Sequence, residues 1–251
     1  MKLRNDKILI FGGGSGIGKA IAKRFCIAGA KVIIAGRSEE KLKHATEEIN
    51  STNLYYKPFS ITDIENHSTL FRECIDILGG LNGFVNAAAL GTESYTGRGY
   101  EPWDITEQEW DDLTDVNFKA AFFLMRNEIN YMLENNIRGN VLNLASNAAC
   151  MDIIGSYGAS KEAIIKWTRS LGKRYGHNGI IINGIAPGAT FTPMISRYAH
   201  DIDQKYERHA IERFIRPEEI AELAYYLMSD YGEIVCGHTV VADGGDKLAT
   251  L

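Results

Sequence analysis

The sequence predicts an α/β protein, a single domain over residues 1–251 built on a doubly wound parallel sheet with helices on both faces. Three observations predict this fold. Short apolar runs alternate with segments of helical periodicity along the chain, which is the pattern of a parallel sheet. A glycine-rich stretch separates the first apolar run from the first helical segment. Small or polar residues follow several other apolar runs, at the strand ends where such sheets bind their ligands.

The first strand is expected at residues 7–11, and the stretch Gly12–Gly18 follows it with the spacing Gly-x-x-x-Gly-x-Gly. The next segment, residues 19–28, has the apolar spacing of a helix. Glycines let the backbone approach a pyrophosphate, and a helix N-terminus offers free N–H groups and the positive end of its dipole. Strand, glycine-rich turn and helix together predict a nucleotide-binding site.

The second strand, residues 31–35, is followed by Gly36, Arg37 and Ser38. A dinucleotide site usually has an acid at this strand end, which binds the ribose hydroxyls of NAD. Gly36 stands in that place with Arg37 beside it, an arrangement that suits the 2′-phosphate of NADP. The sequence therefore predicts NADP, with NAD as the alternative if Arg37 is only a solvated surface charge. Ser38 is expected to cap the next helix, whose first turn holds Glu39 and Glu40.

The other elements follow from the same patterns. Further strands are expected at residues 54–59, 83–86, 140–145, 180–185 and 239–242, and further helices at residues 63–78, 107–136, 157–175 and 217–229. Residues 91–104 and 189–214 are expected to be loops, and a loop as long as the second is often a lid. Both are polar and aromatic, which favours a polar or hydroxylated substrate over a bare steroid.

Residues 146–161 follow one strand and lead into a helix. Tyr157 and Lys161 are one helical turn apart and share a face. A phenol, with a pKa of about 10, is a poor acid or base at neutral pH, but a nearby ammonium lowers that pKa. The hydroxyl of Ser146 could polarise a carbonyl oxygen that Tyr157 then protonates. Beside a hydride carrier, these groups would reduce a carbonyl compound or run the reverse reaction.

The net charge, the apolar runs and the placement of cysteines and histidines argue against several classes of partner and site. The net charge of −5 gives no reason to expect nucleic acid or an anionic membrane surface. No apolar run approaches the length of a membrane span, and no signal peptide is visible. Cys26, Cys74, Cys150 and Cys236 are far apart, which suggests reduced thiols in a cytoplasm. The histidines show no metal-ligand spacing, so no metal site is expected.

With these motifs established, the chain resembles the short-chain dehydrogenase/reductase family, which has a Rossmann-like fold, from about Lys7 to Gly245. The matching motifs are Gly-x-x-x-Gly-x-Gly, Asn86-Ala-Ala-Ala, Asn117, Ser146, Tyr157-x-x-x-Lys161, Pro187-Gly188 and Asp243-Gly244-Gly245. The resemblance implies a catalytic tetrad of Asn117, Ser146, Tyr157 and Lys161. In it, Tyr157 exchanges a proton with the substrate oxygen, Ser146 holds that oxygen, Lys161 lowers the Tyr157 pKa and binds the nicotinamide ribose, and Asn117 holds a water.

The resemblance also implies which residues contact the cofactor. They are Gly12, Gly14, Ser15, Gly16, Ile17, Gly18, Arg37, Ser38, Ser60, Ile61, Asn86, Ala87, Ala88, Tyr157, Lys161, Pro187, Gly188, Thr190 and Thr192. The chain departs from the family pattern at Phe11, Ser60, Ala87 and Ala89, and its gap from Ser146 to Tyr157 is about two residues shorter than usual. Family members are commonly tetramers built on two long helices, which here are residues 107–136 and 157–175. A homo-oligomer, dimer or tetramer, is therefore expected.

The sequence thus predicts an NADP-preferring oxidoreductase that interconverts a ketone and a secondary alcohol, a small-molecule substrate. One alternative within the family is a 3-oxoacyl thioester reductase. A second is a catalytically silent nucleotide-binding regulatory protein, although such a role would not need all four tetrad residues. The sugar-nucleotide epimerases and dehydratases are a remote third, because they have a different glycine spacing and a longer C-terminal domain.

Overall fold

The computed structural model describes residue 3 and residues 6–97, 104–150 and 155–246. Within these residues the chain forms a seven-stranded sheet in the order β3-β2-β1-β4-β5-β6-β7, and each neighbouring pair is parallel. The order reverses between β1 and β4, the point at which such sheets bind ligands. The strands are β1 (Lys7–Phe11), β2 (Lys31–Gly36), β3 (Leu54–Pro58), β4 (Gly83–Asn86), β5 (Gly139–Leu144), β6 (Ile180–Pro187) and β7 (Thr239–Ala242).

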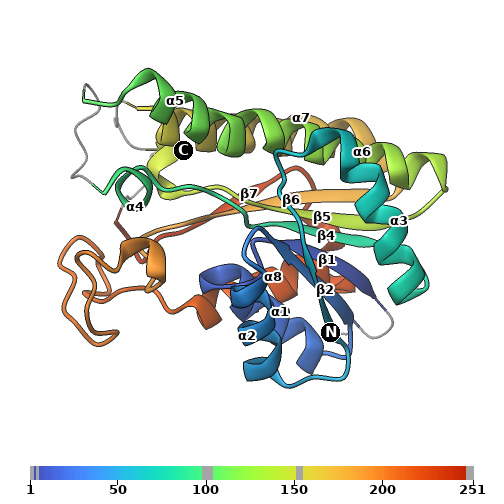
Figure 1. Ribbon diagram of the computed structural model, residues 1–251, viewed down its shortest axis with the longest axis horizontal. Helices are drawn as coiled ribbons and strands as arrows, with labels where there is room; N and C mark the ends of the chain where they lie inside the picture. Colours follow the sequence, from blue (N-terminus) through green and yellow to red (C-terminus); the bar gives the residue numbers. More distant parts are fainter. Residues whose placement is uncertain (1–2, 4–5, 98–103, 151–154, 247–251) are drawn as a thin grey trace.

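Helices cover both faces of the sheet, as the alternation predicts (Figure 1). One layer consists of α1 (Gly16–Ile27), α2 (Glu39–Ile49) and α8 (Pro217–Met228). The other consists of α3 (His67–Leu78), α5 (Glu107–Thr114), α6 (Ala121–Glu134) and α7 (Ser156–Tyr175). None of the helices in the described ranges has both the length and the apolarity that a membrane crossing requires.

The strand β1 shows how the sequence builds these two layers. Successive side chains of a strand point to opposite faces. Ile8 and Ile10 accordingly pack into the core beneath α1 and α8, whereas Leu9 and Phe11 pack into the core beneath α3 and α6. All four side chains are at most 1% exposed. A strand that is buried on both faces is a continuous apolar run in the sequence.

The structure corrects two expected elements. The expected loop 91–104 contains a short helix, α4 (Thr92–Thr96), and its residues 98–103 lie outside the described residues. The expected helix 107–136 is α5 and α6 joined by a π-helical segment, Asp115–Ala120. Wider turns of this kind are common at functional sites, because they free backbone groups from the regular helical pattern.

Smaller differences concern element ends. The helix expected at 63–78 begins as a 3₁₀ turn, Ile64–Asn66, before α3. The third strand ends at Pro58, which has no N–H to donate and is tolerated because β3 is at the sheet edge. The 189–214 loop contains a 3₁₀ turn, Pro193–Ile195, and closes on itself through a bridge between Thr190 and Ile215.

Candidate active site

The glycine-rich turn between β1 and α1 has no space for side chains. Gly12 has a φ of +77°, and a Cβ on it would come within 2.7 Å of the backbone nitrogen of Ala88. A Cβ on Gly18 would be 2.3 Å from the carbonyl oxygen of Gly12. Glycine is therefore required at both positions, and the turn brings the main chain and the N-terminus of α1 together at the carboxyl end of β1.

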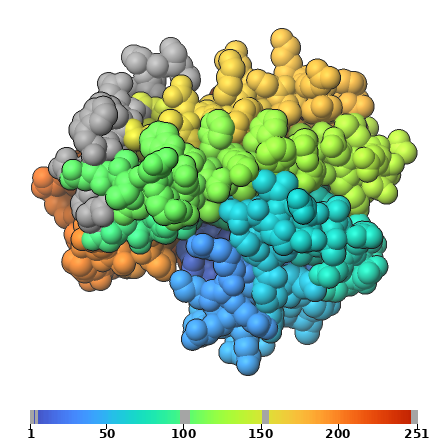
Figure 2. Space-filling view, turned by 45° about the horizontal axis from the view of Figure 1, so that its top comes forward, coloured from blue at the N-terminus to red at the C-terminus, as the bar shows by residue number. Residues whose placement is uncertain are grey.

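A cleft of about 530 Å³ opens beside this turn. In Figure 2 it is the hollow between the blue segment that contains α2 and the green segment that contains α5. Most of the predicted cofactor-binding residues line it, namely Gly12, Gly14, Ser15, Gly16, Ile17, Gly18, Arg37, Ser38, Ser60, Ile61, Ala87, Ala88 and Thr192. The structure therefore brings together residues that are far apart in the sequence but were predicted to share one site.

One end of this cleft is formed by the turn from β2 into α2. Ser38 caps α2, because its Oγ accepts a hydrogen bond from the backbone nitrogen of Lys41 at 3.3 Å. The exposed side chains of Arg37 and Lys41 both line the cleft there. Gly36 leaves the β2 end without a carboxylate, so this end of the cleft carries two cations and no acid from the strand.

Tyr157 and Lys161 lie in the first turns of α7, and Ser146 follows β5. The hydroxyl of Ser146 is close enough to the phenol of Tyr157 to influence the pKa of that phenol. Lys161 is 2% exposed; its Nζ donates a hydrogen bond to the carbonyl oxygen of Leu144 at 3.0 Å and lies 5.6 Å from the centre of the Tyr157 ring. The predicted proton-transfer group is therefore assembled at the carboxyl end of β5.

The charges of this group differ from the sequence-based expectation. Burial raises the pKa of Tyr157 above its ordinary value, and the neighbouring hydroxyl of Ser146 lowers that pKa by less. Burial also lowers the pKa of Lys161 from 10.5 to about 8. Lys161 is not among the groups that shift the Tyr157 pKa here; burial dominates, because removing a phenol from water disfavours its charged form. At neutral pH Tyr157 is a neutral phenol, the form that can donate a proton.

Asn117 lies in the π-helical segment and is 2% exposed. Its Oδ1 accepts from the backbone nitrogen of Leu90 at 2.9 Å, and its Nδ2 donates to the carbonyl oxygen of Leu90 at 2.7 Å. These bonds attach the segment to the chain that follows β4. Asn117 thus positions the wall of the first cleft, which Leu90 and Val116 line. The role predicted for Asn117, holding a water molecule, remains a prediction.

Asn86 is not among the residues that line either of the two large clefts. Its Nδ2 donates to Oδ1 of Asn143 at 2.9 Å and to Oε2 of Glu128 at 3.1 Å. Asn143 in turn donates to Oγ1 of Thr168 at 3.0 Å. A chain of hydrogen bonds therefore runs from α6 through β4 and β5 to α7, the helix that carries Tyr157. Asn86 therefore stabilises the packing of β4 against β5 and α6 and does not itself line the cofactor cleft.

A second cleft of about 370 Å³ lies in front of Ser146 and Tyr157. The predicted residues Pro187, Gly188 and Thr190 line it, and it shares Ile17, Thr192 and Met194 with the first cleft. A ligand in one cleft therefore lies next to a ligand in the other. The outer wall of the second cleft is formed by α4, by the 189–214 loop and by Asp246.

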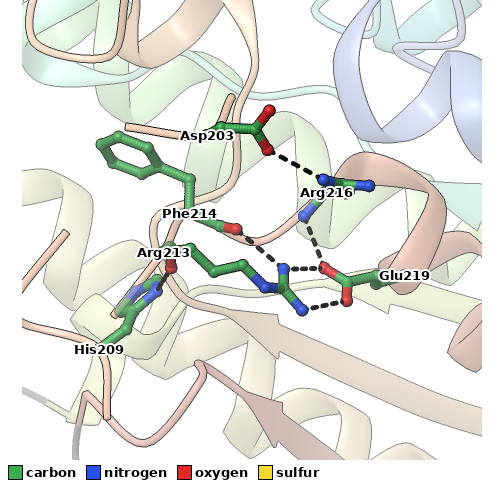
Figure 3. Close-up of polar contacts among 6 residues, drawn as sticks. All are labelled: Asp203, His209, Arg213, Phe214, Arg216 and Glu219. Carbon is green, nitrogen blue, oxygen red and sulfur yellow. Dashed lines mark hydrogen bonds and ion pairs between the residues drawn. The ribbon is translucent and has the colours of Figure 1, made fainter. Parts of the chain in front are cut away.

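The 189–214 loop is attached to α8 by a network of polar contacts (Figure 3). The guanidinium of Arg213 donates two hydrogen bonds to the carboxylate of Glu219, at 2.7 and 2.8 Å. Glu219 also accepts from the backbone nitrogen of Arg216 at 2.8 Å. These contacts lower the pKa of Glu219 to about 2. The base of the loop is therefore held in place, and the buried ring of Phe214 packs against Tyr206 above it.

Sequence reasoning missed four residues, three that line these clefts and one that lies in the core behind them. Lys41 is one helical turn from the cap residue Ser38, a position that faces the same cleft. Thr92 was assigned to a loop, and Asp246 follows the last motif. Glu128 lies between Leu124 and Met132 on the buried stripe of α6, and this periodicity is the signal that could have identified it as a core carboxyl.

Known proteins resemble this chain over nearly its whole length. A family model described as enoyl-(acyl carrier protein) reductase matches residues 12–246. The chain is 31% identical to a 2,5-dichloro-2,5-cyclohexadiene-1,4-diol dehydrogenase from Sphingobium indicum, with 97% of each covered. It is 28% identical to a 3-oxoacyl-(acyl-carrier-protein) reductase from Aquifex aeolicus, with 98% of each covered. The structure of a 3-ketoacyl-(acyl-carrier-protein) reductase from Brucella melitensis complexed with NADH has the same fold, with a TM-score of 0.87, 23% identity and coverage of 98% of this chain and 99% of that one.

Proposed function

Because the chain belongs to the short-chain dehydrogenase/reductase family, we infer that it is a nicotinamide-dependent oxidoreductase that interconverts a ketone and a secondary alcohol. The observation that supports this most directly is the adjacency of the two clefts. The glycine-rich turn forms one, the Ser146–Tyr157 pair faces the other, and Ile17, Thr192 and Met194 belong to both.

The residues of the first cleft fit a dinucleotide. Side chains at Gly12 and Gly18 would collide with the backbone, so the turn keeps its main chain free for a pyrophosphate. We propose that NADP is preferred, since Arg37 and Lys41 can pair with a 2′-phosphate at the end of the cleft. When bound, the nicotinamide supplies the hydride for reduction of the ketone and accepts one from the alcohol in the reverse direction.

The chain's own residues would handle the proton. In the reductive direction, the neutral phenol of Tyr157 donates its proton to the substrate oxygen, while the hydroxyl of Ser146 donates a hydrogen bond to the same atom. The positive charge of Lys161 stabilises the phenolate that remains. In the oxidative direction the phenolate takes the proton back from the alcohol.

The cofactor assignment is tested by fluorescence titration of the purified protein with NADPH and with NADH. Arg37→Ala is expected to weaken NADPH binding about tenfold, which corresponds to about 1.4 kcal/mol, and to leave NADH binding little changed. Lys43→Ala removes a cation from the exposed side of α2 and serves as the control. A wild-type preference for NADH would reject the NADP assignment and favour NAD-linked alcohol oxidation.

The catalytic assignment is tested by Tyr157→Phe, which removes the proton donor and little volume. Loss of a general acid costs about 100-fold or more, so kcat for ketone reduction is expected to fall by that factor while NADPH still binds. Unchanged function in this variant would favour the regulatory reading of the protein.

We also propose that the enzyme is a homo-oligomer. Trp110, Phe118 and Phe122 are between 39% and 45% exposed on the layer formed by α5, the π-helical segment and α6, which faces the viewer in Figure 2. The ring centroids of Phe118 and Phe122 lie 4.9 and 5.2 Å, respectively, from the ring centroid of Trp167 on α7. A second copy of the same layer would cover this aromatic surface.

A reducing compartment such as the cytoplasm is the setting that we propose, because the described cysteines form no disulfide.

A further inference from the structure

The outer wall of the second cleft carries polar groups that lack partners among the described residues. Oγ1 of Thr92 is buried and forms no hydrogen bond within that part of the chain, and the residue lines the cleft beside Glu93. Tyr198 and Tyr206 line the same wall from the 189–214 loop. Neither phenol, nor the carboxylate of Glu93, forms a hydrogen bond or an ion pair with another residue in the described part of the chain. These four residues line the same cleft as Ser146 and Tyr157.

The two phenols line the same cleft as Ser146 and Tyr157, and they stay neutral. Burial is the largest cause of the raised pKa of Tyr198. The hydroxyl of Tyr198 also interacts electrostatically with Tyr206, Glu93 and Tyr157. Burial also raises the pKa of Tyr206. Both phenols are therefore available as hydrogen-bond donors and acceptors at neutral pH.

The charges on this wall do not cancel. Arg208 lies 3.5 Å from a carboxylate oxygen of Asp246, and the other oxygen accepts from Nδ2 of Asn147 at 2.9 Å. The side chain of Asp246 is 9% exposed and that of Arg208 is 56% exposed, so this pair is buried at its carboxylate and open to water at its guanidinium. The remaining charge is the carboxylate of Glu93. A carboxylate accepts hydrogen bonds from hydroxyl groups and repels an anionic ligand.

We propose that the substrate is a small, uncharged, polyhydroxylated alcohol or its ketone, of the cyclitol or monosaccharide type. This inference rests on the proposed function, because the reacting oxygen is bound by Ser146 and Tyr157. Further hydroxyls of the substrate donate to Glu93 and exchange hydrogen bonds with Tyr198 and Tyr206. The cleft of about 370 Å³ lies within the range of roughly 300–1,000 Å³ that small-molecule sites occupy.

The chemistry of the wall explains why hydroxyls decide recognition. A ligand without them would leave the buried oxygen of Thr92 and the two phenols without partners. Sites built to hydrogen-bond a substrate hydroxyl discriminate strongly against analogues that lack it. An acyl thioester with an anionic carrier arm would meet the carboxylate of Glu93, so this wall favours a neutral polyol over a 3-oxoacyl thioester.

The test is a panel of steady-state assays of the full-length protein with NADP⁺ or NADPH. The substrates are myo-inositol, neutral aldoses and polyols, cyclohexanol as the hydroxyl-poor ring, and acetoacetyl-CoA as the anionic thioester. We expect kcat/KM for at least one neutral polyol to exceed that for cyclohexanol by about 100-fold or more. Glu93→Gln and Tyr198→Phe should each raise KM for that polyol about tenfold or more. Glu207→Gln is the matched control, because Glu207 lies in the 189–214 loop with Tyr198 but is paired with Lys205.

The outcomes separate the substrate inference from the proposed function. Turnover of cyclohexanol or acetoacetyl-CoA at least as efficient as that of every polyol overturns the inference and leaves the oxidoreductase intact. Binding of NADPH without turnover of any polyol overturns it as well. A Glu93→Gln variant with an unchanged KM removes the assigned role of that residue and, with it, the inference. Failure to bind NADPH or NADH, together with no turnover of any substrate, would reject the proposed function itself.

Discussion

Glu128 is a carboxylic acid in the core of the protein. Its side chain is 0% exposed, Oε2 accepts from Asn86 at 3.1 Å, and Oε1 has no hydrogen-bond partner among the described residues. Burial raises the pKa of Glu128 from 4.5 to about 8, although the hydrogen bond from Asn86 acts in the opposite direction. The residue is therefore a neutral acid at pH 7, at one end of the hydrogen-bond chain that reaches α7.

Glu128 predicts a specific dependence of stability on pH. Between about pH 4.5 and pH 8 the folded protein retains a proton at Glu128 that the unfolded chain has lost. The free energy of unfolding therefore decreases as pH rises through that window. Glu128→Gln retains an acceptor for Asn86 without the ionisation, so its melting temperature should exceed that of the wild type by an amount that grows from pH 5 to pH 8.5. Glu134→Gln, at the exposed end of α6, is the control. A difference that does not change with pH would contradict the assignment.

Lys161 predicts a pH dependence of activity. Its pKa of about 8 means that its charge is lost as pH rises through that value, whereas Tyr157 stays protonated because its pKa is raised. The rate of ketone reduction at saturating substrate should therefore decline above about pH 8, since an uncharged Lys161 no longer stabilises the phenolate. In Lys161→Met the residual rate should lack this decline. If the variant keeps the same pH profile, another group is responsible.

At the scale of elements, the substrate cleft depends on how the 189–214 loop is held. Tyr198 and Tyr206 extend from this loop into the cleft, and the loop is attached to α8 through Arg213 and Glu219 (Figure 3). Both side chains of the pair are between 39% and 43% exposed, so water weakens its contribution to global stability. The pair matters more for local order, because it fixes where the loop begins its return to the sheet.

Glu219→Gln is therefore expected to affect substrate binding more than folding. The substitution removes one charge of the pair with Arg213, and the loop should sample more conformations. KM for the substrate should rise several-fold, with kcat nearly unchanged and a melting temperature only a few degrees lower. Glu218→Gln, next to it on α8 and exposed, should change none of these values. A fall in kcat with a constant KM would show that the loop acts on the chemical step instead.

At the scale of the whole molecule, the aromatic surface over α5, α6 and α7 is the proposed contact between copies of the chain. Phe118→Glu combined with Phe122→Glu introduces two charges there and should yield a smaller species by size-exclusion chromatography with light scattering. Ile27→Glu changes an apolar residue that is 72% exposed at the end of α1 and should leave the assembly unchanged. The double variant should still bind NADPH, which separates loss of assembly from loss of folding. A monomeric wild type would contradict the proposal.

Local patterns were sufficient for much of this architecture. Residues 7–11, 83–86 and 239–242 were predicted with the observed ends, because each is a short apolar run whose length and flanking residues favour a buried strand. The glycine-rich turn, Tyr157 and Lys161 were recognised because their motifs occur at the ends of predicted strands; the spacing of Tyr157 and Lys161 by itself would carry little weight. The order of the strands then determines that these motifs meet at one edge of the sheet.

The rest depends on tertiary contacts. The five residues of α4 are too few for a helical period, and the π-helical segment exists where Asn117 bonds to Leu90, a contact distant in sequence. The pairing of Glu128 with Asn86 and the raised pKa of Tyr157 both arise from burial, which spacing does not reveal. Sequence therefore predicted which groups would react, and the folded structure adds the effect of burial on their charges.

The short bridge between Thr190 and Ile215 has a consequence for how this enzyme could diversify. It brings the two ends of the loop together, and the backbone nitrogen of Phe191 donates to the carbonyl oxygen of Ile215 at 2.8 Å. The intervening segment is thus an exchangeable cassette whose two joints already meet on the scaffold. Lineages that share the glycine-rich turn could acquire new substrates by replacing the part of this cassette that follows Met194, while Thr192 and Met194, which line the first cleft, are retained. Exchange of that part of the loop is accordingly a route to redesigning the enzyme's selectivity.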